Sequence, residues 1–159
     1  MPLRFDVEGG RFNVRVAGIA VREDHVLVHR GTDEDFWTFP GGRLEFGEES
    51  SQALVREMGE ELGVPVDVGQ LFFTVENFFP YAGRFYHELS YYYAMSLPET
   101  FPFSDREIVH RCRDEGTELE FRWLPTPLAA SEGAGLQPAF LRQRLRRLPT
   151  ATEHIVWRA

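Results

Sequence analysis

The chain has 159 residues, 43% of them apolar, and a net charge of −8 at neutral pH, so we expect residues 1–159 to form a single globular domain. The acidic balance excludes a protein that clamps duplex nucleic acid through its phosphates. No apolar run approaches the ~18 residues of a membrane span, the N-terminus lacks an apolar signal segment, and the one cysteine cannot form an intrachain disulfide, which together indicate a cytoplasmic protein that binds no membrane.

The first part of the chain predicts two strands, a glycine turn and a helix. The strands are expected over residues 12–21 and 26–30, joined by a short polar turn. A short extended piece over residues 35–39 then enters the turn Pro40-Gly41-Gly42. The helix follows over residues 50–62, with a glycine at its C-terminal cap and a proline just beyond.

The second part predicts three more strands and a second helix. Two aromatic-rich runs, residues 66–79 and 84–96, flank a hairpin turn at residues 80–83. Residues 98–116 are polar and read as irregular, and the apolar and polar alternation over residues 117–124 predicts a strand. A basic helix over 138–148 and a short tail close the chain. Strands with intervening helices indicate an α/β or α+β domain, and the first hairpin means that the sheet is not all parallel.

The helix over residues 50–62 carries an acidic face. Glu57, Glu60 and Glu61 have the spacing i, i+3, i+4, which places them on one side of a helix, while the apolar residues recur at the spacing of a buried stripe. Like charges at this spacing repel one another. A solvated acidic face is the simple interpretation, but a rigid carboxylate cluster also suits a hard divalent cation such as Mg²⁺.

The spacing of glycine, glutamate and arginine over residues 42–64 resembles the signature box of the Nudix hydrolases. Every fixed position of that box is filled, by Gly42, Glu48, Arg56, Glu57, Met58, Glu60, Glu61, Gly63 and Val64. The flanking segments 37–42 and 121–125 also resemble the family. The resemblance implies an α/β/α sandwich around a mixed β-sheet, with the box forming a loop, a helix and a loop at one edge.

The resemblance also implies a metal site and its supporting residues. The implied metal ligands are Glu57, Glu60, Glu61 and the carbonyl group of Gly41, and the implied catalytic residues are the three glutamates with Arg56. Arg56 would hold a glutamate in place through an ion pair, and Gly42 and Glu48 would support the loop. Mg²⁺ is the implied cofactor, with Mn²⁺ as a substitute. The implied partner is a small nucleotide substrate, and a homodimer is one possible assembly.

Outside the box, four residues are candidates for binding the substrate. Arg30 ends a strand, where it can meet a phosphate or form a surface ion pair. Tyr81 and Tyr86 are the aromatic side chains that we expect to be exposed and able to stack on a base. Glu120 either approaches the metal or belongs to a solvated strand face. His29 shows no ligand spacing, and we expect a polar surface or a hydrogen-bonded histidine there.

The implied reaction is hydrolysis of a nucleoside diphosphate linked to another moiety. Nucleoside triphosphates, ADP-ribose or nucleotide sugars, and dinucleoside polyphosphates all belong to this substrate class. Pro80 is associated in the family with ADP-ribose and Tyr81 with dinucleoside polyphosphates, so the two adjacent residues point both ways. The alternative is a catalytically silent Nudix-like domain that senses a nucleotide or binds a partner, but this chain keeps every box residue.

Overall fold

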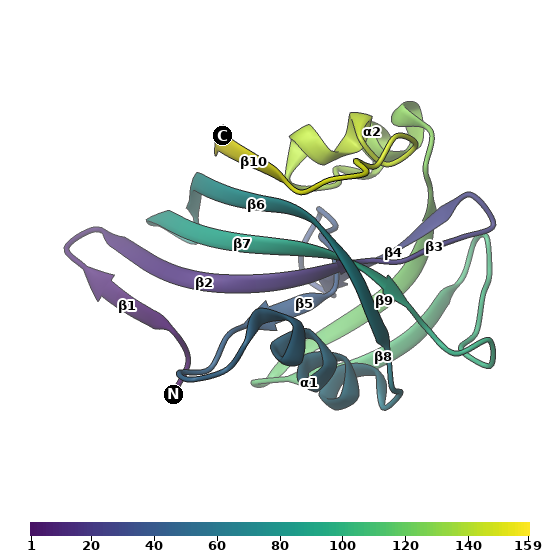
Figure 1. Cartoon of the computed structure of the whole chain (residues 1–159), viewed down its shortest axis with the longest axis horizontal. Coiled ribbons are helices and arrows are strands. Elements are labelled where there is room, and N and C mark those ends of the chain that lie inside the picture. Colours follow the sequence, from purple (N-terminus) through teal and green to yellow (C-terminus); the bar gives the residue numbers. More distant parts are fainter.

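The computed structural model describes residues 1–159, which form two β-sheets with short helices on either side (Figure 1). The larger sheet is mixed and has the order β1-β2-β7-β6-β10, with β5 paired to β2. Its strands are β1 (Arg4–Val7), β2 (Gly10–Ile19), β5 (Gly41–Arg43), β6 (Asp67–Tyr81), β7 (Arg84–Ser96) and β10 (Glu153–Arg158). The pairs β2–β7 and β6–β10 are parallel, and the other pairs are antiparallel.

The smaller sheet is antiparallel and has the order β3-β4-β9-β8. Its strands are β3 (Val21–Arg22), β4 (His25–Gly31), β8 (Ile108–Asp114) and β9 (Thr117–Pro125). Helix α1 (Ser50–Leu62) lies on one side of the sheets, and α2 (Leu128–Ala134) and the 3-10 helix η1 (Ala139–Gln143) lie on the other. The expected α/β/α arrangement around a mixed sheet is therefore confirmed.

Alternation along the strands builds two hydrophobic clusters, one under each helical layer. Val16 and Leu27 pack in the cluster that contains the apolar stripe of α1, whereas Ala17 and Val28, one residue further along, pack in the other cluster. Adjacent residues of a strand point to opposite faces, so each strand feeds both clusters. The apolar positions of these strands thus specify two cores. They also determine to which face of its sheet each polar side chain points.

Helix α1 has the bounds that the sequence predicts. Leu54 and Met58 are fully buried, and Leu62 is nearly so. The helix ends at Gly63, whose φ of 68° is left-handed and whose N–H donates to the carbonyl oxygen of Gly59. Only glycine adopts this conformation at low cost, so the C-terminus of the helix is set locally.

Several expected elements differ in the structure. The glycines of the predicted turn Pro40-Gly41-Gly42 belong to strand β5, which pairs with β2. The predicted strand 12–21 breaks at Ala20, because the chain leaves the larger sheet after β2 and enters the smaller one at β3. The predicted turn 80–83 contracts to Ala82-Gly83, both with positive φ, and the two residues before it remain in β6 as partners of β7. Two-residue hairpin loops of this kind need positive φ at both positions, which matches the strand twist.

The polar segment 98–116 was expected to be irregular, but it contains strand β8. This strand pairs on one side only, with β9, and its exposed positions carry charged side chains, as edge strands often do. At the C-terminal end, the predicted helix 138–148 is reduced to η1, and the unpredicted helix α2 precedes it. The short tail is strand β10, which pairs with β6. No helix of the structure is long and apolar enough to cross a membrane.

Candidate functional site

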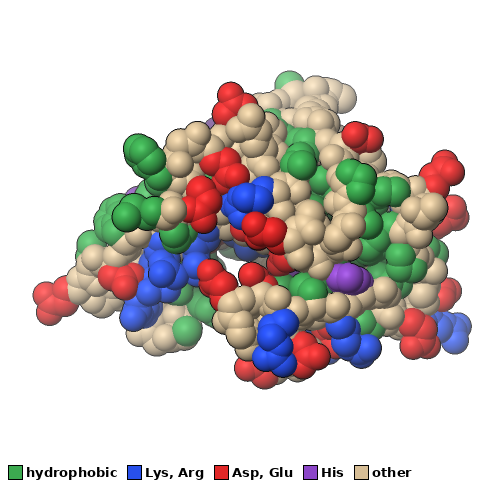
Figure 2. All heavy atoms as spheres, turned by 90° about the horizontal axis from the view of Figure 1, so that it is seen from below, with side chains coloured by type: hydrophobic (Ala, Val, Ile, Leu, Met, Phe, Trp, Pro, Cys, Tyr) green, Lys and Arg blue, Asp and Glu red, His purple; other side chains and the backbone are tan.

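One cavity of about 920 Å³ collects most of the polar residues that the fold buries. Its walls come from both sheets, from α1 and from the loop between β8 and β9. Figure 2 shows that the surface seen from below is hollowed near its middle and that acidic and basic side chains surround the opening. The size of this cavity suits a nucleotide-sized ligand, and its polar walls suit a charged one.

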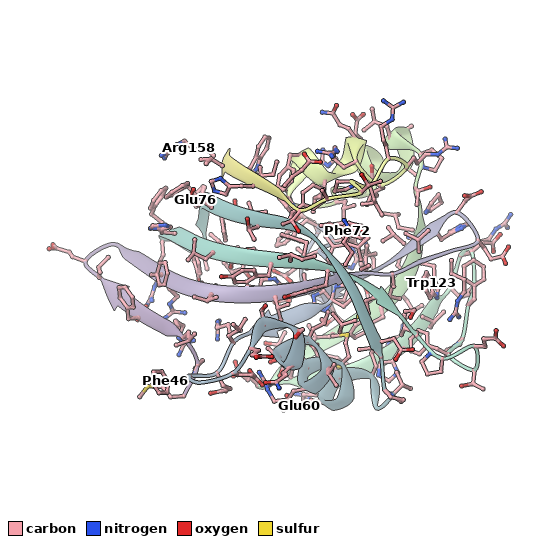
Figure 3. The ribbon with its side chains drawn as sticks, viewed as in Figure 1. Phe46, Glu60, Phe72, Glu76, Trp123 and Arg158 are labelled. Carbon is pink, nitrogen blue, oxygen red and sulfur yellow. The ribbon has the colours of Figure 1, made fainter.

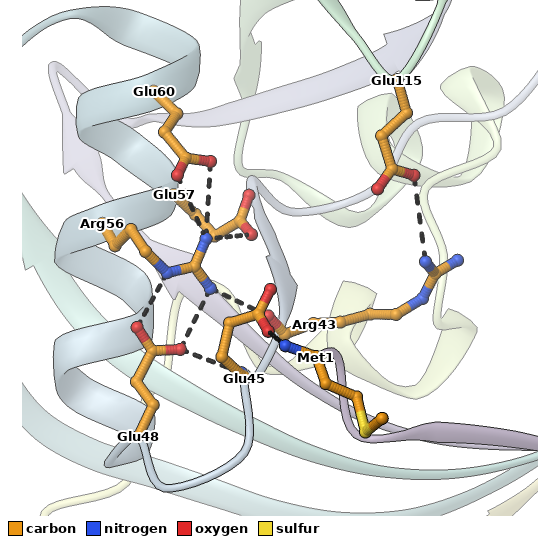
Figure 4. A network of polar contacts seen from close by, with 8 residues as sticks. All are labelled: Met1, Arg43, Glu45, Glu48, Arg56, Glu57, Glu60 and Glu115. Carbon is orange, nitrogen blue, oxygen red and sulfur yellow. Dashed lines mark hydrogen bonds and ion pairs between the residues drawn. The ribbon is translucent and has the colours of Figure 1, made fainter.

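Arg56 organises the carboxylates at one end of the cavity (Figure 4). Its Nε donates to Glu48 Oε2 at 2.7 Å and its Nη2 to Glu48 Oε1 at 3.0 Å. Its Nη1 donates to Glu57 Oε1 at 3.0 Å and contacts Glu60 at 3.4 Å. Charge-assisted bonds of this kind lower the pKa of Glu48, mainly through the hydrogen bond from Arg56. One guanidinium therefore ties the loop before α1 to the acidic face of α1.

The two glycines of strand β5, which precedes the helix, leave room for Glu57. A Cβ added at Gly42 would lie 2.2 Å from the carboxyl carbon of Glu57, and a Cβ at Gly41 would lie 1.9 Å from the carbonyl oxygen of Val16. Both distances are far below van der Waals contact. Glycine at these positions is required by close approach, since Gly41 runs against β2 and Gly42 lies directly under the Glu57 carboxylate.

Glu61 is buried with only 5% of its surface exposed, and its Oε2 has no hydrogen-bond partner. Burial raises its pKa to about 9, and the neighbouring charges of Glu57 and Asp114 add to the effect. Burial also raises the pKa of Glu57, with Arg56 acting in the opposite direction. A buried carboxylate without a partner is costly unless a cation or proton compensates it.

These observations test whether the residues fit a divalent cation. Glu57, Glu60 and Glu61 line one end of the cavity together with Asp114, and they offer the oxygen ligands that Mg²⁺ prefers. The side chains are not already gathered into a group of three or more metal-holding residues. The carboxylates repel one another, and Arg56 holds Glu57 and Glu60 through hydrogen bonds, which explains why the side chains stay apart in the absence of a cation. The unpaired Oε2 of Glu61 is the atom that a cation would satisfy, so the donor set fits.

The part of the cavity wall that the larger sheet supplies is polar, and the sequence did not predict it. Asn13 and Arg15 of β2, Asn77 of β6 and Glu88 of β7 line it. Each of these four side chains lies on the side of its strand that lines the cavity. A single signal was available, namely isolated polar residues at alternating positions within apolar, aromatic-rich strands. That pattern does not indicate a binding site unless the pairing of the strands is known.

His29 also lines the cavity, contrary to its expected place as a surface or hydrogen-bonded residue. It is 7% exposed, and its Nδ1 has no partner. Burial and the nearby charge of Arg15 lower its pKa to about 3. This histidine is therefore neutral throughout the physiological range.

The four candidates for substrate binding divide into two pairs. Tyr81 and Tyr86 line the cavity, but Tyr86 is 9% exposed, so the expectation that it is exposed was wrong. Tyr81 is 43% exposed and its hydroxyl donates to Glu34 at 2.8 Å. Arg30 and Glu120 do not line the cavity; they pair with each other at 2.9 Å, which leaves Glu120 away from the acidic cluster.

Comparison with known proteins identifies the class to which this fold and site belong. The sequence model of the NUDIX domain family matches residues 11–143 of the chain. The chain therefore belongs to the Nudix family, and the resemblance drawn from the box is confirmed.

Two curated relatives share shorter stretches. A "MutT-like protein" of Streptomyces ambofaciens is 41% identical over 66 residues, which cover 41% of this chain and 43% of that one. An "8-oxo-dGTP diphosphatase" of Proteus vulgaris is 51% identical over 45 residues, covering 28% and 40% of the two chains. The matched stretches thus span about two fifths of the length of these relatives.

A solved structure extends the likeness over nearly the whole fold. The NUDIX hydrolase from Nitrosomonas europaea superimposes with a TM-score of 0.58 at 17% identity, over 92% of this chain and 79% of that one. At this level of identity the agreement concerns the fold alone.

Proposed function

We propose that the chain is a Mg²⁺-dependent pyrophosphohydrolase, which cleaves a nucleoside diphosphate linked to another moiety. The observation that carries the proposal is the buried, unpaired Oε2 of Glu61, a residue that lines the same cavity as Glu57 and Glu60. A carboxylate in this state has a cation as its natural partner, and the cavity beyond it is large enough for the nucleotide.

The charged box residues and the neighbouring Gly41 have separate tasks in this proposal. Glu57, Glu60 and Glu61 would hold the cation, with the carbonyl group of Gly41 as a further oxygen ligand. When bound, Mg²⁺ supplies positive charge that neutralises phosphate oxygens and aids the delivery of water. Arg56 is a positioning residue, because its bonds to Glu48 and Glu57 fix the direction of the acidic side chains.

Arg15 supplies a second positive charge within the cavity. Its Nη2 donates to the carbonyl oxygen of Phe39 at 2.6 Å, which holds the guanidinium beside the segment that leads into β5. Arg15 is close enough to Glu61 and His29 to influence the pKa values of both. The guanidinium group of arginine matches phosphate geometry well, so we assign Arg15 to binding a phosphate oxygen of the substrate. The sequence had suggested Arg30 for this role.

The proposal requires adjacent phosphates and a nucleoside. Phosphoryl transfer depends on positioning and charge neutralisation, and a cation held by several carboxylates is matched to oxygens of neighbouring phosphates. A simple phosphomonoester has no such pair of phosphates. The name of the Proteus vulgaris relative, an "8-oxo-dGTP diphosphatase", fits this class of substrate, but the matched stretch is short and does not choose among the members of the class.

The test is a hydrolysis screen with product identification by chromatography. Nucleoside triphosphates, nucleotide sugars, ADP-ribose and dinucleoside polyphosphates are each incubated with Mg²⁺, with Mn²⁺ and with a chelator. We expect a nucleoside monophosphate and a phosphorylated remainder, formed only with a divalent cation. Efficient hydrolysis of p-nitrophenyl phosphate, with no activity on any nucleotide derivative, would overturn the substrate class. Full activity with a chelator present would overturn the metal dependence.

A further inference from the structure

A row of buried polar side chains crosses three central strands of the larger sheet. Asn13 of β2 pairs in register with Glu88 of β7, and Glu88 pairs in register with Asn77 of β6. The three residues are 3%, 7% and 7% exposed, in that order. All three line the cavity that also holds the box glutamates. We call this set the Asn13–Glu88–Asn77 row.

The hydrogen bonds of this row leave acceptors unused. Glu88 Oε2 accepts from Asn13 Nδ2 at 2.7 Å, and Glu88 Oε1 accepts from the hydroxyl of Ser90 at 2.8 Å. Asn13 Oδ1 and Asn77 Oδ1 have no partner although both atoms are buried. A polar row with only a structural role would satisfy its own atoms, because an unmet buried polar group costs stability. Unpaired acceptors on a cavity wall indicate a ligand that donates.

Aromatic side chains flank the row on the same face of the sheet. Two residues along each strand, Tyr86 and Phe79 pair in register and stack with ring centroids 5.1 Å apart and planes 11° apart. Beyond Asn77, the row continues to Trp157 of β10, which pairs in register with Asn77 and also lines the cavity. Flat rings around a hydrogen-bonding wall favour a flat, polar ligand such as a nucleobase.

We propose that the Asn13–Glu88–Asn77 row binds the hydrogen-bonding edge of the substrate's base and selects a base with two adjacent N–H donors. The row offers the carboxylate of Glu88 and the unpaired amide oxygens of Asn13 and Asn77 as acceptors, and the amide nitrogen of Asn13 already donates to Glu88. The amide nitrogen of Asn77 is the donor of the row that no other side chain uses. Among the common bases, guanine alone places a ring N–H beside an exocyclic amine. Uracil presents one N–H between two carbonyl groups, which would oppose these acceptors.

This inference deepens the proposed function, because it names the base of the substrate that the metal end would cleave. The expected preference is guanine first, adenine and cytosine next, and uracil last. Adenine and cytosine offer an exocyclic amine but a ring acceptor beside it. A site built to hydrogen-bond N–H groups rejects analogues that lack them far more strongly than an apolar pocket could.

The first experiment measures binding without catalysis. Dissociation constants of GMP, IMP, AMP, CMP and UMP are obtained by NMR titration of the full chain in a chelator. We expect GMP to bind about 10- to 100-fold tighter than UMP, the range expected for hydrogen bonds to a charged group. IMP keeps the ring N–H of GMP but lacks the exocyclic amine, so it should fall between the two. Equal affinities for all five nucleotides overturn the inference.

The second experiment changes the row and a matched control. Glu88→Gln replaces a carboxylate acceptor by an amide and should bring GMP affinity down to that of UMP. Asn77→Leu removes an unpaired group, so it should keep or raise the thermal stability while it weakens GMP binding. Glu76→Gln is the control, since Glu76, which Figure 3 labels on β6, neighbours Asn77 but contacts His154 and does not line the cavity. It should bind all nucleotides as the wild type does.

The outcomes separate this inference from the proposed function. Selective GMP binding that Glu88→Gln abolishes, in a chain that hydrolyses no nucleotide, supports the row and rejects the hydrolase. Metal-dependent hydrolysis with no preference among the bases rejects the row and keeps the hydrolase. If the chain is active, Glu88→Gln should raise KM for the guanine substrate with kcat nearly unchanged. An equal loss for every base would indicate a structural role and overturn the assignment.

Discussion

Arg56 and Glu48 form a two-pronged contact across the loop that leads into helix α1, with Nε–Oε2 and Nη2–Oε1 distances of 2.7 and 3.0 Å. The remaining Nη1 of the same guanidinium reaches Glu57. Because a planar fork makes these contacts together, the direction of Glu57 depends on a residue outside the helix. The Arg56–Glu48 pair therefore acts as a brace for the acidic end of the cavity.

Arg56→Lys should lower kcat by about 10-fold or more, because an ammonium group cannot reproduce the fork and charged hydrogen bonds contribute strongly. Steady-state kinetics and a Mg²⁺ titration measure the effect, and the half-saturating Mg²⁺ concentration should rise. The matched control is Arg144→Lys, since Arg144 makes a similar two-pronged contact with Glu153 outside the cavity. Equal losses in the two variants would mean that the fork serves only stability.

Glu61→Gln should lower kcat by about 100-fold or more while it stabilises the metal-free chain. The wild-type carboxylate is buried, unpaired and close to other acidic groups, so a neutral amide of the same shape should add at least about 1 kcal/mol to the free energy of unfolding. Denaturant unfolding in a chelator measures this change. Glu60→Gln should give a smaller gain, because the Glu60 side chain is 57% exposed. If Glu61→Gln keeps full activity at saturating Mg²⁺, Glu61 is not a metal ligand.

Magnesium should raise the melting temperature of the wild type, since a ligand that binds only the folded state adds RT ln(1 + [L]/Kd) to its stability. The expected gain is about 2.7 kcal/mol at a hundredfold excess over Kd. Thermal scans with and without Mg²⁺ test this, and Glu61→Gln should lose most of the gain. An unchanged melting temperature in the wild type would count against a divalent-cation site.

Two glycines of the box region make a second matched pair. Gly42→Ala should abolish most activity, because the new methyl group would overlap the Glu57 carboxyl carbon at 2.2 Å. Gly59→Ala adds a methyl group with no atom within 4 Å, in the interior of α1, and should raise stability by about 1 kcal/mol with activity retained. Kinetics and thermal unfolding of both variants check the contrast. Similar activity in the two would show that Glu57 has room to move.

His29 should make the chain sensitive to acid. Its pKa is about 3 in the folded chain and about 6.5 when unfolded, so protonation favours the unfolded state as pH falls below 6.5. At pH 5 the loss should be about 2 kcal/mol relative to neutral pH. His29→Gln should remove this part of the pH dependence in denaturant unfolding, whereas the same change at the exposed His87 should not. A wild type as stable at pH 5 as at pH 7.5 would contradict the burial of a neutral histidine.

Local features of the fold were predictable from the sequence because local physics sets them. The bounds of α1 follow from the apolar stripe and from Gly63, whose backbone conformation excludes most other residues. The hairpin at residues 82–83 is likewise marked by a glycine. The spacing of the box placed its glutamates on one helix face, and the structure places them at one end of a cavity.

Features that depend on strand pairing were not predictable. Asn13 and Glu88 are 75 residues apart in the chain, and nothing local marks them as partners. The burial of Tyr86 depends on its contact with Phe79 across the β6–β7 hairpin. Strand β8 carries polar residues because it is an edge strand, so its composition resembles that of a loop. The pairing of the strands determines which polar side chains come into contact, and the composition of a segment does not predict that pairing.

Strand β10 covers the outer edge of β6 between Phe73 and Phe78. Without it, a long strand with buried apolar residues such as Val75 would present unpaired backbone groups, and such an edge recruits other chains. The opposite edge of the sheet is the short strand β1, which carries Arg4 and Asp6 and discourages pairing. Removal of residues 150–159 should therefore promote self-association through β6. We therefore expect the last strand of the fold to limit aggregation at high concentration.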